Sequence, residues 1–266
     1  MSLVHGKVIQ YSVIRAAATQ QLREVTLLQP TLMRIRHGEK HLWMHEQQQI
    51  AGKSDILIGP AGMQLTLSNV PDAQGYYCEI LQFHPHLIER FRHDYGAILQ
   101  NIAQQAPQFI ATITPVIAQT WDETLAALTR EEPAAMLEHR ALGLLLAIAL
   151  AGYGSALLSI RSDSLAERVQ QLMMLHPARN WSVDEVAKQL HLGASTLRRQ
   201  LDQEGSSFRS ILDQVRLNLA LGLIQTSKLA IGDIAQQCGY ASASRFSARF
   251  QQQFGLKPLQ LRATVA

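Results

Sequence analysis

The sequence predicts an α+β protein, in which a small cupin-like β domain with added helices precedes an all-α domain. Three observations lead to this prediction. Short apolar runs separated by glycine and proline turns fill residues 1–83. Apolar residues then recur with the period of a helix through most of the remaining chain. Within that helical region a short segment occurs twice, as residues 182–201 and 231–250.

The apolar runs of the N-terminal region are short and rich in β-branched residues, which is typical of strands. Turn signals such as Gln29-Pro30, Gly38 and Gly59-Pro60 separate them. The runs cover Val25–Leu28, Thr31–Ile35, His41–Met44, Ile56–Ile58, Met63–Leu67 and Tyr76–Phe83. Several short strands joined by tight turns indicate a jelly-roll or cupin-like barrel.

Helical periodicity after the strands predicts three helices, over His86–Ala106, Pro115–Thr129 and Pro133–Gly152. The third helix is apolar, with no charged residue between Arg140 and Arg161, which is long enough to cross a bilayer. Because Gly152 interrupts it, we expect no membrane span. Two interpretations stay open, a helix of the monomer core and a helix at a homodimer interface. The interface would use Leu142, Leu145, Leu146 and Ala149.

Several histidines raise the question of a metal site. His37, His41 and His45 are four residues apart, which corresponds to about 13 Å along a strand, too far for one ion unless the chain folds back. His84 and His86 flank a proline and fit a corner between a strand and a helix. We therefore expect no metal and no other cofactor.

The repeated segment has the pattern of a helix-turn-helix unit. In each copy an alanine follows a β-branched core residue, as in Val186-Ala187 and Ile234-Ala235, where two helices cross closely. A second helix follows, with buried residues four apart. Its outward positions are Ser195, Thr196, Arg198 and Arg199 in copy one, and Ala243, Ser244, Arg245, Ser247 and Arg249 in copy two. A small, polar and basic helix face fits a DNA major groove.

The outward residues suggest different roles in the two copies. Arg198 and Arg199 are candidates for hydrogen bonds to guanine, which arginine reads with its two-pronged guanidinium. Copy two presents mainly short side chains, so we expect it to rely on phosphate contacts from Arg245 and Arg249 and on DNA shape.

The linking segments define the domain organisation. Sequences typical of capping boxes start helices at Ser164 and Ser182. We therefore predict a sensor and dimerisation domain over residues 1–160 and a DNA-binding domain over residues 161–266. Phe208–Thr226 is predicted as the long helix that joins the two copies. Its apolar stripe consists of Leu212, Val215, Leu219 and Leu223.

Charge and cysteine usage agree with this division. Residues 163–266 contain 12 lysines and arginines against 8 acidic residues, whereas residues 1–162 contain 12 against 13. A basic module on a nearly neutral partner domain is typical of DNA binding. The two cysteines, Cys78 and Cys238, are far apart, and the N-terminus lacks the apolar core of a signal peptide, so we expect a cytoplasmic protein.

The order of residues in the second copy and around it resembles the signature of the AraC/XylS family of bacterial transcription regulators. The matching positions are Arg216, Leu217, Ala220, Leu223, Ile224, Ile231, Ile234, Ala235, Cys238, Gly239, Tyr240, Ser244, Phe246, Phe250, Phe254, Gly255, Pro258 and Arg262. Two features depart from the pattern. His191 stands where such units usually have glycine, and Ala248-Arg249 reverses the commoner order.

The resemblance implies a regulator, an activator in many members, that binds double-stranded promoter DNA. It further implies a cupin-like N-terminal domain, a homodimer, a small-molecule effector and contact with RNA polymerase. We expect no enzyme activity. Two alternatives stay open, a cupin-type metal-dependent enzyme fused to a DNA-binding module, and a regulator without a ligand. The effector-binding residues are unknown; Leu42, Trp43, Leu65 and Tyr77 are candidates for a pocket in the barrel.

Overall fold

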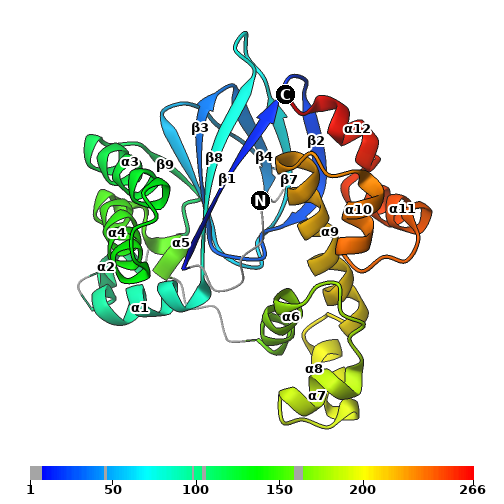
Figure 1. Ribbon diagram of the computed structural model, residues 1–266. Coiled ribbons are helices and arrows are strands. Elements are labelled where there is room, and N and C mark those ends of the chain that lie inside the picture. The colour runs from blue at the N-terminus through cyan, green and yellow to red at the C-terminus, as the bar shows by residue number, and fades with distance from the viewer. Residues whose placement is uncertain (1–7, 45–46, 98, 104–105, 159–163) are drawn as a thin grey trace.

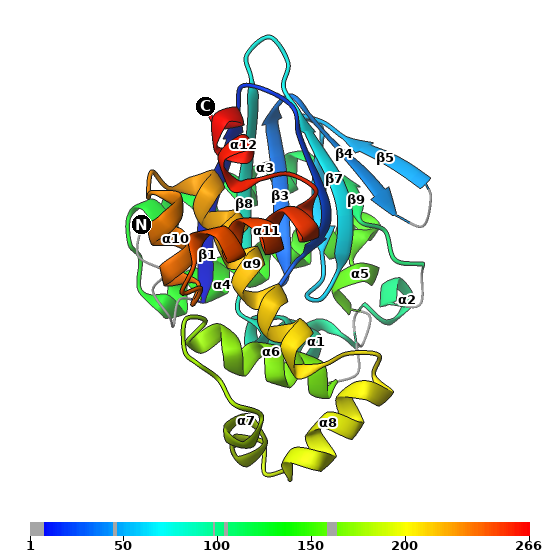
Figure 2. The same ribbon diagram turned by 90° about the vertical axis from the view of Figure 1, so that its right-hand side faces the viewer.

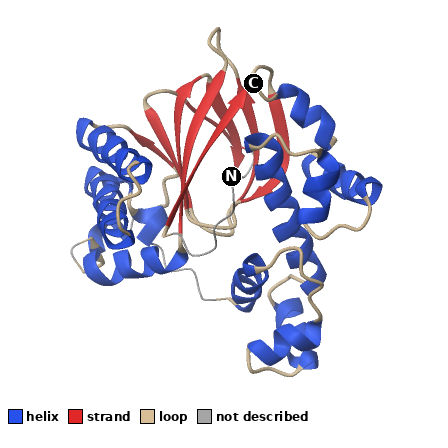
Figure 3. Cartoon of the chain, viewed as in Figure 1, coloured by secondary structure: helices blue, strands red, loops and turns tan. Residues whose placement is uncertain are grey.

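The computed structural model describes residues 8–44, 47–97, 99–103, 106–158 and 164–266. Two antiparallel sheets lie at the centre, with one group of helices on each side (Figures 1 and 3). This arrangement confirms the predicted α+β class and its cupin-like β domain.

The two sheets have strand orders in which neighbours are distant in sequence, as in a jelly roll. One sheet consists of β1 (Ile9–Ala16), β8 (Tyr76–Phe83), β3 (Thr31–His37), β6 (Asp55–Gly59) and β9 (Ile110–Thr112). The other consists of β2 (Gln20–Thr26), β7 (Gln64–Val70), β4 (Glu39–Met44) and β5 (Gln47–Ala51). All six predicted apolar runs lie in or beside these strands, while β1, β5 and β9 were not predicted.

The five-stranded sheet is buried on both faces. Leu57 and Cys78 point into the space between the sheets, whereas Ile58 and Leu81 point to the layer of helices. The layer consists of α1 (Pro85–Tyr95), α2 (Gln100–Ala103), α3 (Pro115–Thr129), α4 (Ala134–Ile148), the π-helix η1 (Ala149–Tyr153) and α5 (Ser155–Leu158). Burial on both faces explains why β6 contains the continuous apolar run Ile56–Ile58.

The prediction of one helix over His86–Ala106 is wrong, because α1 ends at Tyr95 and α2 is a separate short helix. The start of α1 agrees with the predicted corner, since the ring nitrogen Nδ1 of His84 accepts a hydrogen bond from the backbone N–H of His86 (3.3 Å). The last turn of α1 contains Arg92 and His93, basic residues that are favourable at a helix C-terminus.

Of the two interpretations of the third helix, the structure favours the monomer core, and only Leu146 of the four residues named for a homodimer interface is partly exposed. Leu142, Leu145 and Ala149 are at most 4% exposed and pack inside the single chain against the sheet and neighbouring helices. Ala134–Tyr153 is the one described helix segment with the length and mean hydropathy of a membrane span. Its buried residues make it a core helix in this fold.

Among the residues that the structure describes, no group of three or more His, Cys, Asp and Glu side chains lies close enough to hold a metal ion. His41 instead contacts the Glu39 carboxylate (2.9 Å). His45 lies outside the described residues.

The C-terminal helices lie on the opposite side of the sheets from α3 and α4 (Figure 1). They are α6 (Leu165–Leu175), α7 (Val183–Gln189), α8 (Ala194–Gln203), α9 (Phe208–Thr226), α10 (Ile231–Gln237), α11 (Ala243–Phe254) and α12 (Pro258–Thr264). The predicted boundary at residues 160 and 161 lies outside the described residues. The second copy is not independent of the β domain, because Leu221 and Phe254 share one apolar cluster with Leu42 and Leu65.

Candidate nucleic-acid interface

The first helix-turn-helix unit consists of α7 and α8. The Ser182 hydroxyl caps α7 by accepting a hydrogen bond from the N–H of Glu185 (3.2 Å). The Glu185 side chain forms an ion pair with Arg179 and does not complete the predicted capping box. This contact ties the start of α7 to the preceding loop.

The buried side of α8 fixes which residues face outward. Leu197 and Leu201 are fully buried against α6 and α7 in one apolar cluster. The opposite side therefore faces solvent. Its predicted residues are the exposed Ser195, Arg198 and Arg199 and the half-buried Thr196.

The second unit consists of α10 and α11. Three phenylalanines on α11, Phe246, Phe250 and Phe254, are fully buried, and successive ring centroids are 5.6 and 4.6 Å apart. This aromatic stack fixes the rotation of α11. Outward lie the exposed Ala243, Ser244, Arg245 and Arg249 and the half-buried Ser247. We call α8 and α11 the reading helices.

The two turns have the same backbone conformation with different residues. Gly239 has φ +80°, and His191 has φ +57°. A positive φ is easy for glycine and costs a residue with a Cβ about 1–2 kcal/mol. The family's usual glycine is therefore replaced here at a conformational cost, while the turn geometry is kept.

The outward arginines differ in their surroundings. Within the described residues, no acidic side chain pairs with Arg198, Arg199 or Arg245. Arg249, in contrast, forms an ion pair with Asp213 of α9 and donates to the Gln252 side chain (2.9 Å). The guanidinium groups of Arg198, Arg199 and Arg245 are therefore available to an anion, whereas that of Arg249 is already paired with a carboxylate of the protein.

The polar groups near the second turn do not titrate near neutral pH. Burial, and then the nearby Asp213 carboxylate, raise the pKa of the Tyr240 hydroxyl. Burial raises the pKa of the Cys238 thiol to about 12, so this thiol stays neutral and unreactive. The positive charge of this surface therefore comes from arginines, whose charge is independent of pH in the physiological range.

The connecting helix α9 begins and ends at the predicted residues, Phe208 and Thr226. Two of its four predicted stripe residues, Leu212 and Leu219, are only partly buried. The buried surface of the helix is nevertheless broader than predicted, because it includes other residues. The buried residues are Ile211, Val215, Leu217, Ala220, Leu221, Leu223, Ile224 and Gln225. The helix is covered on more than one side because it contacts α6, the second unit, α12 and strands β1 and β2.

Hydrogen bonds attach α9, α11 and α12 to the β domain, and α11 lies beside β2 (Figure 2). The N–H of Thr26 donates to the Asn218 side chain (3.0 Å). The N–H of Ala17 donates to the Thr264 carbonyl (2.8 Å), and the Gln253 amide donates to the Glu24 carbonyl (3.0 Å). Any change in strand β2 is thus transmitted directly to α9 and α11.

A buried polar network, which sequence reasoning missed, lies at the same junction. The Lys40 ammonium donates to the Asn69 side-chain oxygen, and the Asn69 amide donates to Gln20 Oε1 (2.9 Å). Gln225 of α9 donates to the same Gln20 oxygen (3.0 Å), and Gln20 donates to the Thr264 hydroxyl (2.9 Å). The network therefore connects the barrel interior with α9 and α12.

Lys40 is the unusual member of this network. It is 1% exposed, and burial lowers the pKa of its amine. No carboxylate pairs with it in the region of the chain that the structure describes. An ammonium has three donors, and a buried cation without a counter-ion is costly. Lysine occurs in strands at so many exposed positions that its sequence context alone gave no signal.

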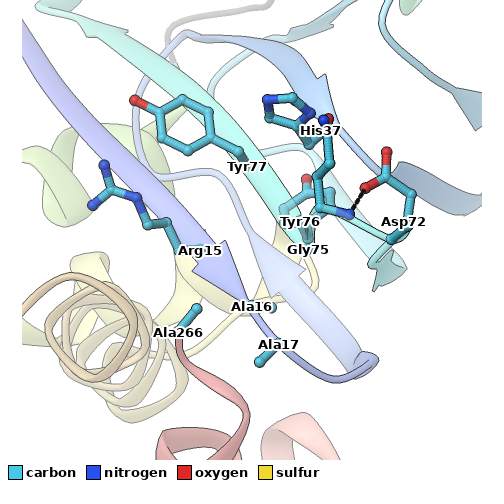
Figure 4. A pocket seen from close by; sticks show the side chains of 11 residues that line it. Arg15, Ala16, Ala17, His37, Asp72, Gly75, Tyr76, Tyr77 and Ala266 are labelled. Carbon is cyan, nitrogen blue, oxygen red and sulfur yellow. Dashed lines mark hydrogen bonds between the residues drawn. The ribbon is translucent and has the colours of Figure 1, made fainter.

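The four residues that the sequence suggested for a pocket in the barrel do not line one common cavity among the described residues. Leu42 and Leu65 belong to the apolar core between the sheets, and Trp43 is 37% exposed on the outside. Tyr77 lines a cavity of about 470 Å³ where β1 ends and β8 begins, and the Arg15 guanidinium lies against the Tyr77 ring, 4.9 Å from its centroid (Figure 4). Ala266 lies on the opposite wall, so this cavity also adjoins the end of the DNA-binding region.

Comparison with known proteins agrees with this geometry. Residues 186–264 match a protein family described as a helix-turn-helix domain, of the AraC type. The virulence regulon transcriptional activator VirF of Yersinia enterocolitica is 28% identical over 186 residues, covering 66% of this chain and 69% of VirF. The urease operon transcriptional activator of Escherichia coli is 35% identical over 96 residues, covering 36% of this chain and 32% of that protein. The C-terminal region of this chain is therefore a helix-turn-helix domain of the AraC type, and the chain is similar to transcriptional activators that contain one.

Solved structures match the fold along the whole chain. ToxT from Vibrio cholerae superposes with a TM-score of 0.67 at 16% identity, covering 98% of this chain and 100% of ToxT. A structure described as unsaturated fatty acid bound ToxT gives the same TM-score and covers 100% of this chain. At this identity the likeness shows the fold. The chain therefore combines a cupin-like N-terminal domain with a C-terminal helix-turn-helix domain of the AraC type.

Proposed function

We propose that this regulator activates transcription by placing α8 and α11 of one chain in two successive major grooves of promoter DNA. The observation that carries this proposal is the pair of outward basic faces on reading helices joined by one unbroken helix. The 19 residues of α9 correspond to about 28 Å at 1.5 Å per residue. That length is close to one turn of B-DNA, about 34 Å.

The residue roles follow from the surroundings described above. Arg198 and Arg199, which have no acidic partner among the described residues, are proposed to read bases together with Ser195 and Thr196. Arg245 is proposed to bind phosphate. Ala243, Ser244 and Ser247 are proposed to lie close to the groove floor. Arg249 is proposed as a phosphate contact that must first leave Asp213.

This proposal can be tested even though the natural promoter is unknown. Duplexes that bind the wild-type protein are selected from a random-sequence library, and the bound duplex is cleaved with hydroxyl radicals. We expect two protected stretches on one face of the duplex, about 10 base pairs apart. Arg198→Ala and Arg199→Ala should weaken protection of one stretch more than of the other. One short protected stretch would contradict the two-groove arrangement.

We also propose that the β domain binds a carboxylate with an apolar chain, whose carboxylate pairs with Lys40. Three features support it: a buried Lys40 amine that has no carboxylate partner among the described residues, the surrounding apolar core, and the network that leads to α9 and α12. The structure of ToxT with an unsaturated fatty acid makes this class of molecule a reasonable first probe. A regulator whose β domain only dimerises is the competing function.

Thermal unfolding with oleate and with oleyl alcohol tests the effector proposal, since the two probes differ in the carboxylate. Oleate should raise the melting temperature of the wild type, because a ligand that binds only the folded state stabilises it. Oleyl alcohol should have a smaller effect, and Lys40→Met should remove the difference. Equal shifts with both probes would exclude Lys40 as the anchor.

The other elements of the proposal rest on the family. We propose that residues 1–160 sense and dimerise, that residues 161–266 bind DNA, and that the bound protein contacts RNA polymerase in the cytoplasm. The relatives are described as transcriptional activators, which supports regulation and not enzymatic activity. Exposed apolar residues on the helical layer, Val116, Met136 and Leu150, support a homodimer surface there.

A further inference from the structure

Arg216 lies near the middle of the connecting helix and contacts both the loop that leads into the first helix-turn-helix unit and the turn of the second unit. Its Nε donates to the carbonyl of Pro177 (3.0 Å), and its Nη2 donates to the carbonyl of Arg179 (2.9 Å). Both carbonyls belong to the loop between α6 and α7, which leads into the first unit. One guanidinium group thus holds the start of the first unit against α9.

The other side of the same guanidinium packs on the turn of the second unit. A Cβ added to Gly239 would lie 2.8 Å from Arg216 Cζ and 2.9 Å from Nε, closer than side-chain atoms approach each other. The ring centroid of Tyr240 is 5.9 Å from Cζ, within the range of a cation–π contact. Arg216 therefore fills the space between the loop of one unit and the turn of the other.

This packing explains why the two turns tolerate different residues. His191 and Gly239 occupy equivalent positions with positive φ, yet only Gly239 faces an arginine at its Cβ position. The His191 side chain is exposed and has room. Glycine is thus required in the second turn for a contact between the units as well as for its own backbone conformation.

We propose that Arg216 is a positioning residue that fixes the separation and rotation of α8 relative to α11, and thereby the spacing between the two DNA boxes that one chain accepts. The inference rests on the two-groove reading proposed above. Changing the spacer by one base pair moves one box by about 3.4 Å and rotates it by about 34°. Only a pair of reading helices held rigidly relative to each other loses affinity for a duplex whose spacer has been changed in this way.

The contact needs an arginine, because the planar guanidinium reaches two carbonyls that are two residues apart while it covers Gly239. A lysine keeps the charge but has a single ammonium group without a flat face. Arg216→Lys therefore weakens the link between the units with little change in net charge. Arg209→Lys is a matched control, since Arg209 is exposed on the same helix.

Two measurements test the proposal, each on the full chain. The first is binding to the duplex selected by the wild type and to versions with one base pair added to or removed from the spacer. The ratio of affinities for native and altered spacers is used, because a partly unfolded sample changes both affinities equally. The wild type and Arg209→Lys should prefer the native spacer by about tenfold or more. Arg216→Lys should reduce this preference to about two- to threefold.

The second measurement needs no DNA. Spin labels on Gln203→Cys of α8 and Gln251→Cys of α11 report the distance distribution between the reading helices, while the native Cys78 and Cys238 are buried. The distribution should be narrow in the wild-type background and clearly broader with Arg216→Lys. A variant that melts near the wild-type temperature keeps this comparison free of unfolding.

The outcomes separate the inference from the proposed function. If the wild type binds no selected duplex, the proposed function fails, and the spin-label distances still test Arg216. If Arg216→Lys keeps the full spacer preference, or if its distance distribution equals that of the wild type, Arg216 does not set the spacing. Loss of affinity by the same factor on every spacer would likewise overturn the proposal.

Discussion

Arg249 of the reading helix α11 forms an ion pair with Asp213 of the connecting helix α9, and Tyr240 donates to the same carboxylate (3.4 Å). The Asp213 side chain is 20% exposed and that of Arg249 is 45% exposed. An arginine on the side of α11 that we propose to face DNA is thus held by an acid that belongs to the protein. A phosphate has to compete with Asp213 for this guanidinium.

Asp213→Asn should release Arg249 toward DNA. We expect higher affinity for any duplex and a plot of log affinity against log salt that is steeper by about 0.9, the contribution of one additional phosphate contact. Asp213→Asn combined with Arg249→Ala is the control and should lose this gain. An unchanged salt slope in Asp213→Asn would mean that Arg249 does not reach phosphate.

Arg198 and Arg245 should differ in what they recognise. Arg198→Ala should cost about 1–3 kcal/mol on the selected duplex and much less on random DNA, as expected for a base contact. Arg245→Ala should weaken both by a similar factor, because a phosphate contact carries no sequence information. Competition binding with the two duplexes measures both ratios. Equal losses on both duplexes for Arg198→Ala would reassign it to phosphate.

The buried Lys40 should make stability depend on pH. Burial holds the pKa of its amine below the value of about 10.4 in the unfolded chain. Between these two pKa values the unfolded state binds more protons, so stability rises with pH in that window and is lowest below it. Compared with Lys40→Met, the wild type should gain free energy of unfolding from neutral pH toward pH 10. Denaturant unfolding at several pH values measures the difference. If the free energies of unfolding of the wild type and Lys40→Met change with pH in parallel, Lys40 is not the origin of the pH dependence.

Two leucines near the end of the apolar helix should respond differently to a charge. Leu145 is fully buried, and Leu150 is 65% exposed. Leu145→Glu should prevent folding, since an unpaired buried carboxylate exceeds the stability of an ordinary domain. Leu150→Glu should change stability by no more than about 0.5 kcal/mol.

Sedimentation velocity of Leu150→Glu then tests the homodimer. A folded monomer from Leu150→Glu, beside a wild-type dimer, would place the subunit contact on this face. A dimer that survives the substitution would exclude it. Circular dichroism shows whether each variant is folded.

The DNA-binding region could be predicted in detail because its sequence signals are local. The spacing of Leu197 and Leu201, and of Phe246 and Phe250, determines which side of each reading helix is buried. The length of α9 follows from the polar break around Gly205 and from the helix period. These signals depend on residues within two helical turns of each other.

The features that could not be predicted depend on contacts distant in sequence. Strand β5 reads QQQIA and is recognisable only by its pairing with β4. Lys40 looks like an ordinary surface lysine, and its burial follows from packing near α9 and α12, which come much later in the chain. The sequence left two interpretations of Leu145 open, because a helix that is apolar on most sides has the same sequence in a core and in a subunit contact.

Cleavage of DNA by reagents tethered to the two reading helices tests the central claim most directly. An iron chelate attached to Ser195→Cys of α8 or to Ser244→Cys of α11 cuts the DNA nearest to that helix, and the buried native cysteines stay unmodified. On one selected duplex bound by one chain, the two cleavage centres should lie about 10 base pairs apart on the same face. Coincident cleavage centres, or cleavage from α8 alone, would contradict the account.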